Sequence, residues 1–153
     1  MKILKFIALM LILVVSTTTC KDKSDNSSIE ISLTKYSLEG TSCQWQWIKL
    51  KYDGTIIMVN SDEELSQYII CNEGNYPFID FSKNSLLLTG GGTTNGVHSI
   101  DATFTQVAMN QYILKVTVHL TLAGVAEGWS LFALTPRIDN NANITLDVQQ
   151  TFN

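Results

Sequence analysis

The sequence predicts a mainly β domain, an antiparallel sandwich or an open barrel with one short helix, and an α+β fold is the alternative. Short runs of alternating apolar and polar residues recur roughly every 10 to 15 residues and are joined by hairpin-length connections, as in antiparallel sheets. Only residues 62–70 combine a helix start with helical spacing. The sequence therefore predicts an antiparallel β-sheet with one helix packed across it.

The first part of the domain is predicted to hold a weak strand and a hairpin. Residues 29–38 alternate imperfectly, so they indicate a peripheral strand. Residues 43–52 and 55–59 are rich in aromatic and β-branched side chains and flank Asp53-Gly54, a dipeptide typical of two-residue hairpin turns. We therefore expect these two segments to pair with each other.

The predicted helix over residues 62–70 begins at a capping signal. Ser61 is followed three residues later by Glu64, the spacing of a capping box. Leu65 and Ile69 then lie one helical turn apart, on one face.

The remainder of the chain is predicted to be strands separated by turns. Residues 112–122 have the cleanest alternation, with aliphatic side chains on one face and polar ones on the other. Pro136 ends another strand, because proline lacks the donor that a sheet needs. The predicted strands are 78–81, 85–89, 97–107, 112–122, 129–135 and 144–150.

The first twenty residues have the layout of a secretory signal peptide. Lys2 and Lys5 precede an apolar run, residues 6–15, and small residues then lead to Cys20. Ten apolar residues are too few for a helix that crosses a bilayer, which needs roughly 20. A short buried N-terminal helix is the alternative to a signal peptide, and plain signal-peptidase cleavage is the alternative to lipidation of Cys20.

A cysteine at this junction resembles the lipobox of bacterial lipoproteins, in which the cysteine is lipidated and becomes the first mature residue. Thr17 and Thr19 stand where the strict motif has Leu and Gly or Ala, a looser form similar to that of Bacteroidetes lipoproteins. The resemblance implies a signal peptide over residues 1–19, a lipidated Cys20, a flexible tether over 20–28 and one β-rich domain over 29–153. It also implies attachment to the membrane through Cys20, in the bacterial outer membrane and facing the cell surface.

Composition excludes several classes of function. The chain is 45% hydrophobic and 16% charged, which is too apolar for a disordered protein. Its formal net charge is −4 and its Lys and Arg residues form no cluster, so we expect no nucleic-acid partner. Two histidines, His98 and His119, supply neither a metal motif nor a triad signature, so we expect no metal and no cofactor. An acid–base pair such as Asp101 with His119 depends on which strands are neighbours, so we assign no catalytic residue.

Once Cys20 is lipidated, Cys43 and Cys71 remain as an even pair. In an exported protein such a pair predicts a disulfide. Two buried free thiols are the alternative.

A glycine-rich segment is the first candidate for partner contact. It lacks the Gly-Lys-Ser/Thr sequence and the following helix of a phosphate-binding loop, so we interpret it as a long, flexible connection between strands. A plain turn is the alternative. Its residues are Gly90, Gly91, Gly92, Thr93, Thr94, Asn95 and Gly96.

Trp45, Trp47 and Trp129 offer aromatic faces on which sugar rings stack, or they belong to the core. Because apolar residues alternate around each of them, we expect two of the three to be core residues.

From residue 59 to residue 138, the order of features resembles the PrcB-type lipoproteins of protease complexes. The segments that carry this resemblance are SDEEL (61–65), FIDFSKNSLLL (78–88), GGGTTNG (90–96) and WSLFALTP (129–136). The resemblance implies a non-enzymatic protein that binds or stabilises a protease, and it transfers no functional residue.

We therefore expect a non-enzymatic lipoprotein that binds another protein through its loops. A protease is the partner that the resemblance suggests. The alternative is a glycan-binding accessory lipoprotein that uses an exposed tryptophan.

Overall fold

The computed structural model describes residues 28–47, 49–50 and 53–152. The predicted signal peptide, Cys20 and nearly all of the predicted tether lie outside the described residues. So do Ile48, Lys51 and Tyr52 of the predicted strand over 43–52.

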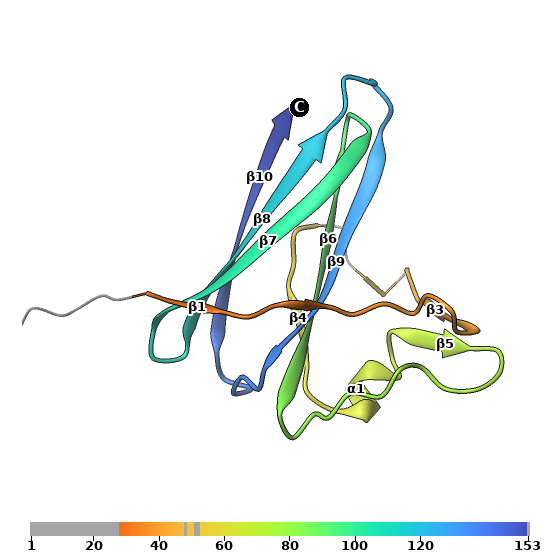
Figure 1. Ribbon diagram of the computed structural model, residues 1–153, viewed down its shortest axis with the longest axis vertical. Coiled ribbons are helices and arrows are strands. Elements are labelled where there is room, and N and C mark those ends of the chain that lie inside the picture. Colours follow the sequence, from red (N-terminus) through yellow and green to blue (C-terminus); the bar gives the residue numbers. More distant parts are fainter. Residues whose placement is uncertain (1–27, 48, 51–52, 153) are drawn as a thin grey trace, which may run out of the picture.

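The protein is a β-sandwich with one short helix, α1 (Asp62–Leu65), which confirms the predicted fold class (Figure 1). We name its three sheets the outer, central and small sheets. The outer sheet has the order β1 (Ile29–Ile31), β7 (Val97–Ala108), β8 (Gln111–Leu120) and β10 (Asn143–Phe152). The central sheet has the order β2 (Thr34–Lys35), β9 (Glu127–Pro136), β6 (Asn84–Thr93) and β4 (Ile57–Val59). The small sheet pairs β3 (Cys43–Trp45) with β5 (Ile69–Cys71).

The long strands pass back and forth between the outer and central sheets. β6 turns into β7 and β8 turns into β9 at the end of the sandwich drawn at the top of Figure 1. There Gly96 holds the two connections together, because its N–H donates to Ala123 O and its carbonyl accepts from Thr121 N. β10 pairs parallel to β8, unlike the other pairs, because β9 returns the chain to the opposite end before β10 begins.

The central sheet is buried on both faces. Leu86 and Leu88 of β6 point into a cluster beneath α1 and the small sheet, whereas Leu87 points into the core shared with the outer sheet. All three leucines are fully buried, which is worth roughly 1.5–3 kcal/mol for each side chain. This burial explains why residues 86–88 form an unbroken apolar run rather than an alternating one.

The small sheet and α1 cover the face of the central sheet that is turned away from the outer sheet. Cys43 and Cys71 are register partners in the small sheet, and their sulfur atoms lie 1.96 Å apart, which confirms the predicted disulfide. Trp45 stacks on Phe132 of β9, with ring centroids 4.1 Å apart. The disulfide therefore closes a lobe whose aromatic side chains pack directly on the central sheet.

The predicted capping signal is present, but the helix is shorter than predicted. Ser61 accepts a hydrogen bond from Glu64 N at 3.2 Å, and Glu64 Oε2 accepts one from Asn60 N at 2.6 Å. The helix ends at Leu65, and residues 69–71 form β5 instead of its last turn. Pairing with β3 and the disulfide outweigh the helical spacing of these residues.

Two further local predictions were wrong. Residues 43–52 and 55–59 do not form a hairpin, because β3 pairs with β5 and β4 pairs with β6. Residues 78–81 are not a strand. Asp80 Oδ1 accepts from the Ser82 N–H and hydroxyl, and Asp80 O accepts from Asn84 N, so the segment is a turn that leads into β6. The Ser82 hydrogen bond and nearby Lys83 hold the pKa of Asp80 below its ordinary value.

A buried polar network fixes the start of β6. The Asn60 side chain accepts from Ser85 Oγ and donates to Asn140 Oδ1, both at 2.5 Å. Ser85 Oγ in turn accepts from Ile138 N at 2.9 Å. Arg137 donates to the carbonyls of Asn60 and Phe81. These bonds join α1, β6 and the connection from β9 to β10 at one point.

Reduction of the disulfide should lower the free energy of unfolding by roughly 3.5 kcal/mol, because the bond closes a loop with a sequence separation of 28. Urea unfolding with and without a thiol reductant measures this difference. A Cys43→Ala/Cys71→Ala variant should show the lower stability and no further response to the reductant. Equal midpoints for the oxidised and reduced protein would contradict the bond's stabilising role.

Candidate binding groove

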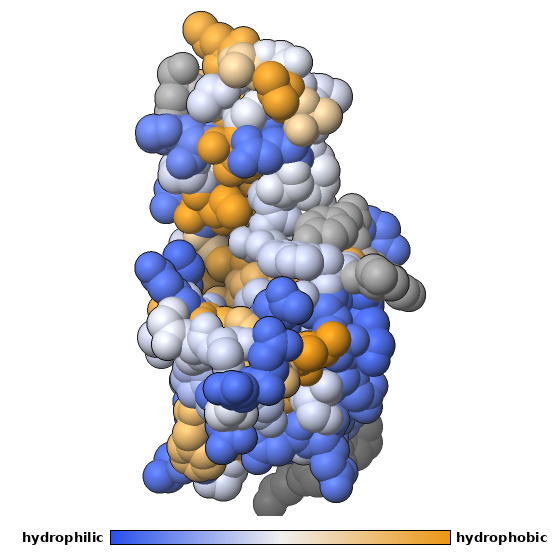
Figure 2. Space-filling model, turned by 90° about the vertical axis from the view of Figure 1, so that its right-hand side faces the viewer, coloured by the Kyte–Doolittle hydropathy of each residue, from blue (hydrophilic) through white to orange (hydrophobic). Residues whose placement is uncertain are grey.

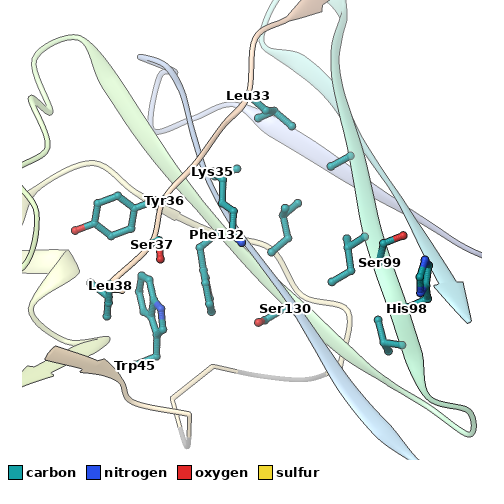
Figure 3. Close-up of a pocket in the computed structure, with 15 residues that line it drawn as sticks. Leu33, Lys35, Tyr36, Ser37, Leu38, Trp45, His98, Ser99, Ser130 and Phe132 are labelled. Carbon is teal, nitrogen blue, oxygen red and sulfur yellow. The ribbon is translucent and has the colours of Figure 1, made fainter. Parts of the chain in front are cut away.

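A groove of about 590 Å³ lies between β7 of the outer sheet and β9 of the central sheet (Figure 3). Ile100 and Ala102 of β7 line one side of it, and Ser130 and Phe132 of β9 line the other. Figure 3 shows the Trp45 and Phe132 rings side by side at one end of the groove, with Ser99 across from Ser130. This volume falls in the range of sites that bind small ligands or extended segments.

The segment that joins β1 to β2 partly bridges the two sheets and bounds the groove. β1 pairs with β7, and β2 pairs with β9, so the chain crosses from one sheet to the other between Ile31 and Thr34. Tyr36 N then donates to Phe132 O at 2.9 Å. Beyond Tyr36 the chain leaves β9 and turns at Leu38, whose carbonyl accepts from Thr41. Residues 33 and 35–38 of this segment line this side of the groove.

Aromatic side chains form the end of the groove beside the small sheet. Trp45 meets Tyr36 edge to face at a centroid distance of 6.0 Å and stacks on Phe132. Burial, followed by the nearby Tyr76 and Asp62, raises the pKa of Tyr36 to about 12. Its hydroxyl donates to Pro77 O at 2.8 Å. Stacked and edge-to-face aromatic rings therefore form this end of the groove.

The groove differs in charge from the rest of the molecule. The chain carries a formal net charge of −4, yet the described residues that line the groove include Lys35 and His98 and neither Asp nor Glu. Figure 2 shows apolar side chains gathered in the upper half of one face, above a mostly hydrophilic lower half. A ligand that enters the groove meets apolar surface edged with basic and hydroxyl groups.

The glycine-rich segment is not the flexible loop that the sequence predicted. Gly90, Gly91, Gly92 and Thr93 belong to β6 and pair with β9 over their whole length. A Cβ atom on Gly91 would lie 2.8 Å from Nε1 of Trp129, so the absence of a side chain there lets the indole pack on the strand.

The last part of that segment is a tight turn. Thr94 is exposed, whereas Asn95 is half-buried and Gly96 is buried. The predicted partner contact of the whole segment, Gly90 to Gly96, stays a prediction, and its accessible part is Gly92 and Thr94. The glycines act here mainly in packing.

The three tryptophans divide as predicted. Trp45 and Trp129 are buried, and Trp47 is 48% exposed. Trp47 lies 6.0 Å from the Phe132 ring, so it extends the aromatic end of the groove toward the surface.

His119 links three strands on the exposed face of the outer sheet. Its Nε2 lies 2.8 Å from Asp101 Oδ2 of β7, and its Nδ1 lies 3.1 Å from the Thr151 hydroxyl of β10. The sequence named the pair of Asp101 and His119 but did not indicate Thr151, because the parallel pairing of β8 and β10 leaves no local signal. The carboxylate is 78% exposed, so the array lies on open surface. It acts as a polar tie across β7, β8 and β10.

Within the described ranges, no three His, Cys, Asp or Glu side chains come together in a group that is able to hold a metal ion. None of the helices described there is long and apolar enough to cross a membrane. The apolar tip between β8 and β9 is exposed, with Leu122 at 83% and Val125 at 64%.

Comparison with known proteins gives no relative. No family model, no curated protein and no solved structure matches the chain. The groove itself carried no sequence signal, because its walls come from strands that are far apart along the chain.

Gly91→Ala should lower the free energy of unfolding by roughly 1–3 kcal/mol, because the new methyl group must displace the buried indole of Trp129. Gly92→Ala is the matched control on the same strand, since a Cβ atom there meets nothing within 4 Å. Thermal or urea unfolding of both variants measures the difference. Equal stability of the two variants would show that Trp129 does not constrain the strand.

Proposed function

We propose that this protein is a non-enzymatic, lipid-anchored module of the bacterial outer membrane that binds another protein in the groove between β7 and β9. The observation that carries the proposal is the groove itself. It is a surface cavity of about 590 Å³ with apolar walls, aromatic side chains at one end and no acidic lining residue among those described. Such an apolar concavity on an otherwise acidic surface is the kind of place where a partner docks.

The lipid anchor rests on the sequence of residues 1–20. Lipid chains on Cys20 contribute ~0.8 kcal/mol for each buried methylene, so two or more chains anchor stably. A nine-residue tether over 20–28 reaches at most roughly 30 Å when extended. The domain would therefore sit close to the membrane.

A protease is the first partner to test. The ordered features over residues 59–138 resemble PrcB-type lipoproteins, which implies a non-catalytic subunit that binds or stabilises a protease. In this protein those features build the central sheet and α1, including the strand β9 that borders the groove.

Crosslinking of the tagged full-length protein on intact cells should recover a second protein in near-equal amount, identified by mass spectrometry. Ile100→Asp places a charge on the groove wall and should reduce the recovery by tenfold or more, because the carboxylate must be desolvated on binding. Thr103→Asp, an exposed site on the same strand that does not line the groove, is the matched control.

A Cys20→Ala variant should leave the membrane fraction, because it has no site for the lipid. Recovery of the protein alone, from cells in which the wild-type protein is membrane-bound, would contradict the binding-module proposal.

Glycan binding is the second candidate, and the exposed indole of Trp47 is the observation that favours it. Trp47 is the exposed member of the aromatic group that also holds Trp45 and Phe132. Ser37, Ser99 and Ser130 supply hydroxyl groups in the adjoining groove. An aromatic face beside hydroxyl groups suits a sugar ring.

If this second candidate is right, titration with a polysaccharide panel should change the tryptophan fluorescence in a saturable way. Trp45 and Trp129 are buried, so Trp47 should supply most of the response. Trp47→Ala should abolish the change, whereas Trp129 emission remains as the internal reference. No change with any polysaccharide would count against a glycan site.

A further inference from the structure

We propose that the partner binds as an added β-strand along the free edge of β9, with an extended segment that alternates apolar side chains and carries an acidic residue. This inference rests on the proposed protein-binding function and specifies the form of the bound segment. Strand addition is a common mode of peptide recognition in which backbone hydrogen bonds supply affinity and side-chain pockets supply specificity.

The backbone groups of β9 alternate between the groove edge and β6. Tyr36 N donates to Phe132 O, so the carbonyl of Phe132 points toward the groove edge and away from β6. Backbone groups alternate sides along a strand, so those of Ser130 and Gly128 point to this same edge. Those of Trp129 and Leu131 point to β6, with which β9 is paired in antiparallel register.

The described strands cover only part of this edge of β9. β2 pairs with Leu134 and Ala133, and the Tyr36 bond to Phe132 is the last in this direction. From Glu127 to Leu131, no strand of the described chain pairs with this side of β9. A bound segment would continue the line of β2 along the same edge. An unpaired strand edge of this kind is a template for another strand.

The groove extends over both faces of the central sheet at this edge. Side chains of an added strand alternate between the two faces of the sheet. On one face, Leu131 of β9 and Ile100 of β7 line the groove, and on the other face Phe132 and Trp45 line it. Side chains on both faces of an added strand therefore find apolar contacts in the groove. A cleft against one face of a sheet would accept only every second side chain.

The groove carries basic side chains and no acidic one among its described lining residues. Lys35 is exposed and lines the groove (Figure 3). His98 lines the groove on β7. Glu127, at the far end of the uncovered edge, accepts a hydrogen bond from Val97 N at 2.7 Å. A carboxylate on the bound segment would meet opposite charge here, whereas most of the remaining surface of this acidic protein would repel it.

The edge of β10 is a competing site away from the groove. It is also unpaired on one side among the described strands, and it is ten residues long. Its side chains are mostly exposed, including Thr145, Asp147 and Gln149, and none of them lines the groove. Val148 and Phe152 of β10 are exposed, but the groove does not extend to them and so does not enclose the side chains of a strand added there. We therefore assign the site to β9.

Ser130→Pro is the variant that tests the backbone bond. Proline removes the N–H that faces the groove edge, and it is tolerated on edge strands where that N–H makes no ladder bond. Ser130→Ala keeps the N–H and removes only the hydroxyl, so it is the matched control. Circular dichroism and thermal unfolding establish that both variants fold.

The probe is a panel of acetylated octapeptides that alternate Val or Ile with Thr or Ser, with and without one Asp. Peptides with the Asp should bind the wild-type protein and Ser130→Ala alike, and bind Ser130→Pro at least tenfold more weakly, since a backbone bond and close contact with the edge are lost. Two further sets of these peptides carry N-methyl groups on the odd or on the even residues. Only the set that blocks the N–H groups facing β9 should lose binding.

Amide hydrogen exchange supplies a second measurement that does not depend on any variant folding. The Ser130 and Gly128 amides should gain protection when the peptide binds, while the amides of β10 should stay unchanged. Absence of binding by every peptide, equal binding by Ser130→Pro, or protection confined to β10 would each overturn strand addition at β9.

The two proposals fail differently. A partner recovered from cells equally well by Ser130→Pro and by the wild-type protein would leave the protein-binding function in place and overturn strand addition. Peptide binding with protection of Ser130, but no partner on cells, would support the edge site and count against the cellular function.

Discussion

The antiparallel pairing of β6 with β9 is the constraint on which the rest of the structure depends. The two strands pair over ten residues, from Asn84 with Pro136 to Thr93 with Glu127, and they form the middle of the central sheet. Both cores pack on this pair: the outer sheet on one face, and α1 with the disulfide-linked small sheet on the other. A shift of one residue would exchange the two sets of side chains between the cores, so the register is fixed by burial on both faces.

Each end of this pair is held by a different kind of contact. At one end, Ser85 joins a buried network with Asn60 and the backbone of Ile138, and an unmatched polar atom there would cost the desolvation of a buried group. At the other end, the Trp129 indole lies against the bare backbone of Gly91. The Ser85 network and the contact of Trp129 with Gly91 thus fix the same register from opposite ends of the strand pair. The position of the β9 edge is fixed with it.

Sequence reasoning succeeded where a pattern is local and failed where the partner is distant. The alternation in β8, the apolar run of residues 86–88, the Ser61 cap and the cysteine pair are local or compositional signals, and the structure bears them out. The choice between pairing β3 with β4 and pairing it with β5 depends on contacts across the fold, so the Asp53-Gly54 signal misled. Glycine signals backbone freedom equally in a loop and under an indole, and only Trp129, far along the chain, decides between them. The groove has no local signal at all.

The groove exists because two strand edges of the sandwich are only partly covered by other strands of the described chain. A sandwich has four edges, and exposed edges invite unwanted pairing unless they are short, charged or covered. The segment containing β1 and β2 covers part of two of them, those of β7 and β9, and then leaves at Tyr36 although both edges continue. Full coverage needed only a few more extended residues. The chain instead turns away to build the disulfide-linked lobe, whose Trp45 walls the uncovered part. This open edge is recessed and lined with aromatic side chains. The recess hinders nonspecific pairing with other strands but admits a segment whose shape and side chains fit the groove, which an edge on a flat surface does not.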